Sequence, residues 1–312
     1  MPETTTLDKP WLVAVWPGMG HVAASAGYYL MSKLGMHALA EFSAPELFDI
    51  EHVEVKNGMI HPARQPRSRL FAWRDPAGRH DLIVFIGEAQ PPHGRYLFCR
   101  RLIEYAKELG VDRVFTFAAM ATPMHPERHS RVFGAAADDA GVGELKRLEV
   151  ELLEDGNISG LNGVLLGVAA EQGLRGTCLL GEMPHIFTQF PFPKASWAVL
   201  EVFAKISGIE IDFAELSEQV DAVEQRLGEI LSQVERAIEQ HASGGEDSFD
   251  VEAEEEHGLE PDDERRIEHL FQQAESDRTK AYELKRELDR LQVFADYEDR
   301  FLDLFKKPDR VP

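Results

Sequence analysis

Histidine and carboxylate side chains gather in a few loops of this 312-residue chain, and most of these loops directly follow an apolar run. Together with their polar neighbours, these side chains are His21, Glu88, Gln90, His93, Thr122, His125, Glu182 and His185. Carboxylates and imidazoles that converge could serve as general acid and base or bind a metal ion. These eight residues show no tight metal-ligand spacing, and no serine lies in a G-x-S-x-G turn. We therefore assign no catalytic residue and no metal ligand, and we treat the set as a candidate rim for a ligand or a protein partner.

Gly18 and Gly20 complete this candidate rim. They belong to Pro17-Gly18-Met19-Gly20-His21, between an apolar run and a helical pattern, where small residues let backbone N–H groups approach an anion. The loop lacks the full G-x-G-x-x-G spacing and the lysine of a P-loop. A tight turn that brings a helix close to a sheet explains the glycines equally well. Both interpretations stay open, and no cofactor is expected.

The elements that position the rim alternate between strand and helix. Apolar runs predict strands at residues 11–16, 81–86, 114–118, 131–134 and 177–180, and helical periodicity predicts helices at 22–34, 96–109, 158–173 and 193–207. This alternation predicts right-handed crossovers and a mostly parallel sheet that is covered on both faces. Ligands of such sheets bind beyond the C-terminal ends of the strands, so we expect the rim at that edge.

Residues 38–74 have a different pattern. Short alternating segments at 51–55 and 69–73 are separated by Asn57-Gly58, a strong hairpin signal. We expect an antiparallel excursion at an edge of the sheet.

The net charge of −22 is distributed unevenly along the chain. From Glu215 onward, 29 acidic residues stand against 13 basic ones, and no basic stripe offsets them. So acidic a protein repels phosphate backbones, which argues against nucleic acid as a partner. The chain has no apolar run of about 20 residues and no secretory signal pattern, so we expect a cytoplasmic protein without a membrane partner.

The chain divides into an α/β domain and an acidic helical extension. We expect residues 1–9 to be disordered and residues 10–212 to form the domain, followed by a heptad helix over 213–241. The heptad seam that forms a candidate helix interface consists of Leu216, Val220, Val223, Leu227, Ile230 and Val234. An acidic disordered linker over 242–264 and a C-terminal helix over 265–307 complete the prediction. The apolar seam of this last helix is interrupted at Asp277 and Glu298.

Several of these segments together resemble the proteasome assembly chaperone family. The resemblance runs in order through residues 16–24, 81–90, 105–114, 158–166, 179–184 and 191–195. No single segment is specific, but their common order covers nearly the whole domain, about residues 10–212.

The resemblance implies a three-layer α/β/α domain, similar to the nucleoside phosphorylase fold, and self-assembly, often as trimers in prokaryotic members. Eukaryotic members chaperone assembly of the proteasome α-ring without nucleotide, and archaeal relatives dock through a C-terminal tail with a hydrophobic residue and a tyrosine. This chain ends in Asp309-Arg310-Val311-Pro312, so we do not expect docking through such a tail.

We therefore predict a non-enzymatic, homo-oligomeric protein of the chaperone type, whose partners are other copies of itself and another protein complex. The alternative is a small-molecule-binding protein or an enzyme that binds a nucleoside- or phosphate-type ligand at the candidate rim. The proline-bounded apolar segment 187–193 is either an interface or buried cover for the sheet. Cys99 and Cys178 are expected to be buried free thiols.

Overall fold

The computed structural model describes residues 7–49, 53–56, 58–62, 64–227, 261–291 and 293–306. The predicted acidic linker, except for its last four residues, lies outside the described residues, as do Ile230 and Val234 of the heptad seam.

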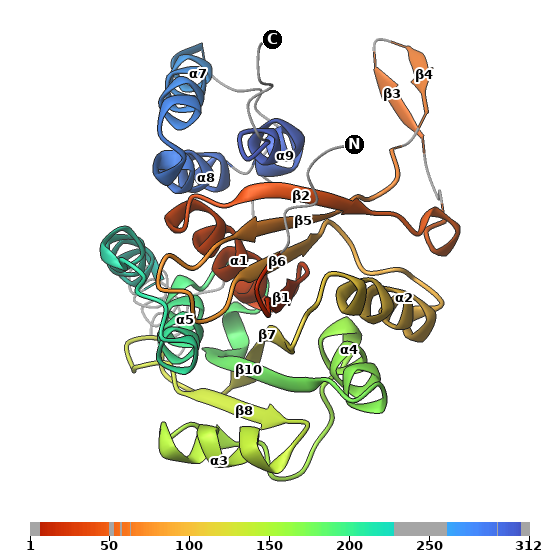
Figure 1. Cartoon of the computed structure of the whole chain (residues 1–312). Coiled ribbons are helices and arrows are strands. Elements are labelled where there is room, and N and C mark those ends of the chain that lie inside the picture. The colour runs from red at the N-terminus through yellow and green to blue at the C-terminus, as the bar shows by residue number, and fades with distance from the viewer. Residues whose placement is uncertain are drawn as a thin grey trace, which may run out of the picture.

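One eight-stranded sheet organises the chain, in the order β2-β5-β6-β1-β7-β10-β8-β9 (Figure 1). Its strands are β1 (Trp11–Val15), β2 (His37–Phe42), β5 (Ser68–Trp73), β6 (Leu82–Gly87), β7 (Arg113–Thr122), β8 (Val132–Ala136), β9 (Glu151–Leu152) and β10 (Arg175–Pro184). The four central strands β6, β1, β7 and β10 are parallel, while β5 and β8 run antiparallel on either side of them. This confirms the predicted mostly parallel sheet.

Helices cover both faces of the sheet, which confirms the predicted three-layer α/β/α fold. α1 (Val22–Lys33) and α5 (Pro193–Ser207) pack on one face, and α2 (Arg95–Glu108) and α4 (Gly160–Glu171) on the other. Alternate residues of β1 point to opposite faces: Val13 and Val15 enter the core under α1, while Leu12 and Ala14 enter the core under α2. Both cores are apolar, as expected of a parallel sheet buried on both sides. α3 (Asp139–Arg147) lies beside β8.

The predicted hairpin is present, but it is separate from the main sheet. β3 (Glu54–Lys56) pairs with β4 (Met59–His61) around Gly58, whose φ of 76° suits the hairpin turn. The predicted segment 69–73 is instead β5 of the main sheet. The hairpin projects from the body between the end of β2 and the start of β5 (Figure 1).

The C-terminal extension folds into three helices, so the predicted single helix over 265–307 is wrong. These helices are α7 (Pro261–Ser276), α8 (Ala281–Arg290) and α9 (Phe294–Asp303). The first break lies at Asp277, where the sequence showed only an interruption of the apolar seam. The Asp277 carboxylate accepts a hydrogen bond from Thr279 N at 3.0 Å and starts a new turn. The second break follows the end of α8 at Arg290 and precedes the start of α9 at Phe294, and Glu298 is inside α9.

Two predicted boundaries also shift. Asp262, Asp263 and Glu264, assigned to the linker, form the first turn of α7, where negative charge is favourable. At the other terminus, the described residues of the predicted tail contact the body: Asp8 N donates to Asp81 Oδ2 at 2.8 Å.

α1 is buried on two sides. Toward the sheet it packs closely on β1, because a Cβ at Gly27 would lie 2.6 Å from Val15 Cγ2. On its other side Tyr28, Tyr29 and Ser32 are buried beneath the C-terminal helices. Ser32 Oγ accepts from Tyr282 N and donates to Thr279 O, both at 3.0 Å. A helix that is apolar all round needs such double burial.

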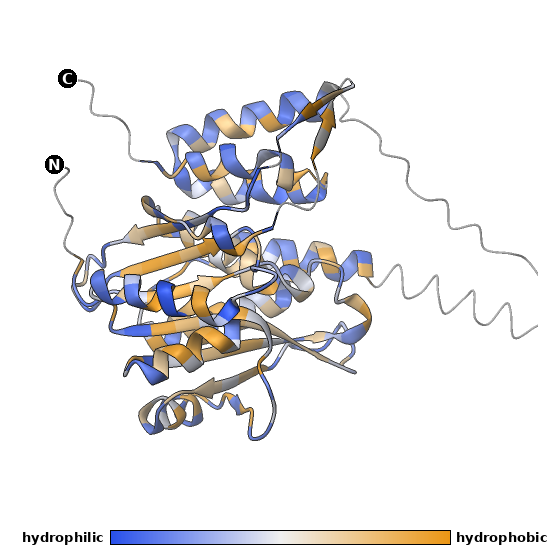
Figure 2. Cartoon of the chain, turned by 90° about the vertical axis from the view of Figure 1, so that its right-hand side faces the viewer, coloured by the Kyte–Doolittle hydropathy of each residue, from blue (hydrophilic) through white to orange (hydrophobic). Residues whose placement is uncertain are grey.

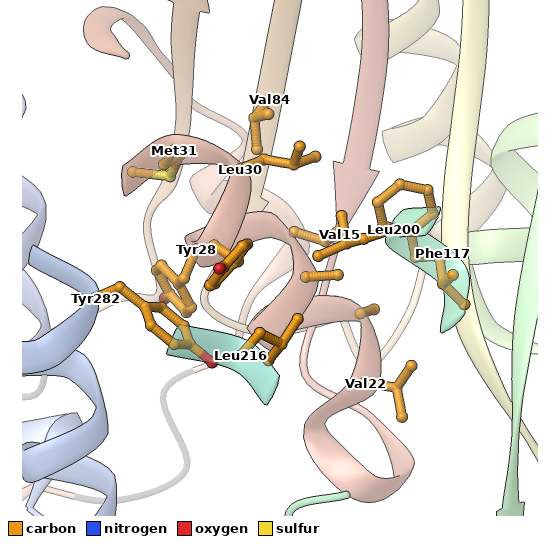
Figure 3. Close-up of a cluster of buried hydrophobic side chains, with 14 of the residues drawn as sticks. Val15, Val22, Tyr28, Leu30, Met31, Val84, Phe117, Leu200, Leu216 and Tyr282 are labelled. Atoms are coloured by element: carbon orange, nitrogen blue, oxygen red, sulfur yellow. The ribbon is translucent and has the colours of Figure 1, made fainter. Parts of the chain in front are cut away.

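The C-terminal helices therefore form an additional layer of the fold. Figure 2 shows this layer above the sheet, whose strands are mostly hydrophobic. Figure 3 shows Tyr282 on one side of α1 and Val15 and Phe117 on the other. The edge strand is covered too: Ala38 N donates to Phe305 O, and the rings of Phe305 and Phe71 lie 5.9 Å apart.

The described part of the predicted heptad helix packs on its own chain. Residues 214–227 are helical, and Asp212 Oδ1 accepts from Ala214 N at 3.0 Å to begin the helix. Leu216 and Leu227 are buried in the core that contains α1, and Val223 packs against it.

We predict that Gly27→Ala lowers the free energy of unfolding by about 1–3 kcal/mol, because the added methyl overlaps the branched side chain of Val15. The matched control is Gly167→Ala in α4, where a Cβ meets no atom within 4 Å. That variant should raise the free energy of unfolding by about 0.5–1 kcal/mol. Chemical denaturation followed by circular dichroism measures both, and equal stabilisation by the two variants would refute the close packing of α1.

Candidate functional site

The loops that carry the predicted rim leave the sheet at the C-terminal edge of its parallel strands. Val15 at the end of β1 lies beside Ile86 of β6, and Pro184 at the end of β10 lies beside Thr122 of β7. The hairpin segment begins and ends at the same edge, because Phe42 of β2 pairs with Ser68 of β5. Polar rim and hairpin are therefore neighbours along one edge, which we call the C-terminal edge.

Glu182 is engaged in a clamp between strands. Its carboxylate is 3% exposed and accepts two hydrogen bonds from the Arg131 guanidinium, at 2.6 and 2.9 Å. Thr122 Oγ1 donates to the same carboxylate at 2.7 Å. The Arg131 bonds hold the pKa of Glu182 below its usual range. Two predicted rim residues thus join β7 and β10 to the start of β8.

Glu88 is engaged elsewhere, beneath α9. Its carboxylate is 8% exposed and accepts from Arg64 Nη2 at 2.7 Å and Arg67 N at 2.8 Å. Arg64, Arg67 and Arg69 also contact the carboxylate of Asp299 in α9. Glu88 and Asp299 therefore share a cluster of three arginines, which ties the C-terminal edge to the extension.

The half-buried carboxylate of Glu298 also joins α9 to the body of the chain. Tyr28 Oη of α1 donates to Glu298 Oε1 of α9 at 2.5 Å. Burial raises the pKa of Glu298, and the Tyr28 hydrogen bond opposes that shift.

Gln90, Gly18 and Gly20 have structural surroundings. Gln90 Oε1 accepts from Leu161 N at 3.2 Å and so satisfies a free N–H at the start of α4. Gly20 has a φ of 59°, and a Cβ there would lie 2.7 Å from Met183 Sδ. Gly18 is extended and borders open space. At Gly20 the structure supports the tight-turn interpretation.

The rim histidines contact different neighbours. His185 Nδ1 lies 3.2 Å from Thr122 O, and His93 Nδ1 lies 3.4 Å from Asp49 Oδ2. His125 Nδ1 accepts from Glu127 N at 3.4 Å. These three side chains are exposed, and His21 begins α1 within electrostatic reach of Lys285 and Asp289 in α8. Each histidine thus has surroundings of its own.

One metal-like spacing was not considered in the sequence analysis. His125 and His129 are four residues apart, which favours a shared metal ion on a helix, but the segment between them is a turn. Within the described residues, no group of three or more His, Cys, Asp or Glu is placed to hold a metal ion. Cys99 and Cys178 are buried free thiols, as predicted, and burial raises the pKa of each to about 12.

Exposed apolar side chains at the C-terminal edge were missed by the sequence analysis. Seven of the eight large, exposed apolar side chains in the described part of the chain lie on its loops and hairpin: Met19, Val53, Val55, Met59, Ile60, Ile186 and Phe190. The eighth, Tyr96, donates a hydrogen bond to Glu171 on α4. The sequence pattern could have predicted some of them, because a short hairpin with apolar residues on both faces leaves at least one apolar face exposed.

The structure supports the buried-cover interpretation for most of the apolar segment 187–193. Phe187 and Phe192 are buried, whereas Phe190 is 54% exposed. The segment is cover for the sheet that also presents one aromatic ring to solvent.

The chain belongs to the PAC2 family, whose model matches residues 12–231. An uncharacterized relative, MJ1210 of Methanocaldococcus jannaschii, is 28% identical over 227 residues, which are 72% of this chain and 84% of the relative. The matched family residues end before α7, so the helices α7–α9 lie beyond them.

Solved structures with this fold include proteins described in terms of the proteasome. PbaB of Pyrococcus furiosus, described as an archaeal proteasome activator, superposes with a TM-score of 0.63 at 26% identity, over 73% of this chain and 96% of PbaB. Rv2125 of Mycobacterium tuberculosis, described as a proteasome-assembly chaperone homologue, has a TM-score of 0.61 at 22% identity, over 70% of this chain and 94% of its own. These relatives confirm the family resemblance stated above.

We predict that Glu182→Gln lowers the free energy of unfolding by about 1–2 kcal/mol at pH 7, because the buried side chain loses its charge-assisted hydrogen bonds from Arg131. The control Glu151→Gln removes an exposed partner of the same Arg131 and should change stability by less than about 0.5 kcal/mol. The pKa of Glu182 is lower in the folded chain than in the unfolded chain, so ionised Glu182 stabilises the folded state. This stabilisation is complete above about pH 4.3 and is lost as the pH falls through the folded pKa. Denaturation at several pH values measures the difference in the free energy of unfolding between the wild type and Glu182→Gln. A difference that stays constant down to acidic pH would contradict the prediction.

Proposed function

We propose that this chain is a non-enzymatic, chaperone-like protein that acts as a homo-oligomer in the cytoplasm and binds protein partners at its C-terminal edge. One observation carries the proposal: seven of the eight large, exposed apolar side chains of the described residues lie on the loops and hairpin of this edge, where the carboxylates of Glu88 and Glu182 are engaged within the chain.

The physical argument is the cost of leaving apolar surface in water. Side chains such as Phe190, Ile186 and Ile60 are more than half exposed, and burying them in a protein interface gains about 25 cal/mol per Å². Clustered apolar groups with a polar surround are typical of protein interaction sites. The preformed loops at this edge keep the entropy cost of binding low.

The comparisons suggest which partner to test. PbaB, at 26% identity, is described as an archaeal proteasome activator, and PAC2 membership is shown for this chain. We propose the proteasome core particle, or its unassembled subunits, as the partner class.

The test is binding of the purified full chain to proteasome core particles from the same organism, measured by surface plasmon resonance. Phe190→Ser should weaken this binding at least about tenfold, as expected for a central aromatic contact. The matched control is Tyr96→Ser, which removes an equally exposed aromatic ring outside the apolar cluster and should leave binding unchanged.

Absence of binding, or equal weakening by both variants, would contradict the proposed partner and site. A thermal-shift screen with nucleosides and phosphate tests the small-molecule alternative. Specific stabilisation that is lost in Glu88→Ala would support the small-molecule alternative instead.

A further inference from the structure

Lys194 is a buried lysine in the first turn of α5. The residue is 7% exposed, and it directly follows Pro193, where the helix begins. Lysine is almost never fully buried without partners, and a cation at a helix N-terminus meets the positive end of the helix dipole. Both effects disfavour the folded state, so the contacts of Lys194 must offset them.

The Lys194 ammonium group is fully paired. It donates to Pro126 O at 2.7 Å and to Arg128 O at 3.0 Å, and it forms an ion pair with Glu224. An ammonium group has three N–H donors, so each donor has one acceptor. Two of these acceptors lie between β7 and β8, in residues 123–130, which we call the 123–130 loop.

Lys194 connects the 123–130 loop to α5. Among the described residues, the other hydrogen bonds of this loop stay within residues 122–128, as in the bond from Arg128 N to His125 O at 3.0 Å. Hydrogen bonds to another element of the chain therefore come to this loop from Lys194.

The loop lies beside the apolar segment that carries Ile186 and Phe190. His185 Nδ1 is 3.2 Å from Thr122 O, where the loop begins, and Lys194 holds the loop further along. Protein interfaces commonly surround an apolar centre with a polar rim. The loop exposes four polar side chains that suit such a rim: His125, Glu127, Arg128 and His129.

We propose that Lys194 is a positioning residue of the partner-binding surface, because it holds the 123–130 loop beside Phe190. The loop then makes polar contacts with the partner, and Arg128 is the side chain that we assign to them, since arginine is enriched at interfaces. A loop that is already ordered loses less entropy on binding. This inference rests on the proposed function, since it adds one loop to the same surface.

The test compares Lys194→Met with the wild type, both as the full chain. Methionine fills a similar volume but has no N–H donor, so the substitution releases the loop and retains the apolar packing. Binding to the core particle, measured by surface plasmon resonance, should weaken at least about fivefold. The matched control is Lys205→Met, which makes the same change at an exposed position of α5 and should leave binding unchanged.

A double-mutant cycle separates positioning from a general loss of stability. Arg128→Ala should weaken binding of the wild type but add little to Lys194→Met, because the released loop no longer presents Arg128. Phe190→Ser should weaken binding by the same factor in both backgrounds, since hydrogen bonds to the backbone of Gly20 hold its segment. Full additivity of Arg128→Ala and Lys194→Met, or wild-type binding by Arg128→Ala, would overturn the inference.

Hydrogen–deuterium exchange of the free chain tests the positioning without a partner. Lys194→Met should speed exchange in the 123–130 loop and leave residues 185–192 and the sheet as slow as in the wild type. Unchanged exchange in the loop, or faster exchange throughout the chain, would overturn the inference.

These outcomes separate the inference from the proposed function. If the wild type does not bind the core particle, the proposed partner fails, and exchange in the loop still decides whether Lys194 positions it. If the wild type binds and Lys194→Met binds equally well, the inference fails while the proposed function stands.

Discussion

Close packing of α1 on β1 is the constraint on which the rest of this structure depends. Gly27 lets the helix approach to a distance at which a methyl group would overlap Val15. A helix held so close to the sheet presents Tyr28, Tyr29 and Ser32 outward, and the two tyrosine rings are large apolar surfaces that are costly to leave in water. The extension that follows the PAC2 domain covers them, so it belongs to the fold although it lies outside the matched family residues.

The same extension determines how the C-terminal edge is used. Asp299 of α9 enters the arginine cluster that also holds Glu88, so charges that could have faced a ligand are satisfied within the chain. At the end of β10, the Arg131 guanidinium donates a hydrogen bond to the Glu182 carboxylate. With its carboxylates engaged, the edge exposes apolar side chains instead, which is the arrangement of an interaction surface.

The fold class could be predicted from the sequence, because the periodicity of apolar residues indicates which side of each helix or strand is buried. The strand at 11–16, the glycine loop and the helix at 193–207 were all predicted within a residue or two, whereas the single C-terminal helix was wrong although its apolar seam is interrupted at Asp277. The site was less predictable, because Glu88 pairs with Arg64, 24 residues before it, and shares its arginine cluster with Asp299, more than 200 residues after it. Which apolar residues stay exposed, such as Ile60 and Phe190, depends on tertiary coverage that local pattern does not encode.

The most direct test of this account is hydrogen–deuterium exchange of the full chain, followed by mass spectrometry on peptides from α1, α8 and α9. If the extension completes the fold, amides of these three helices open together and exchange at one common slow rate. If amides of α8 and α9 exchange rapidly while those of α1 remain protected, the extension is an independent appendage and the central claim is wrong.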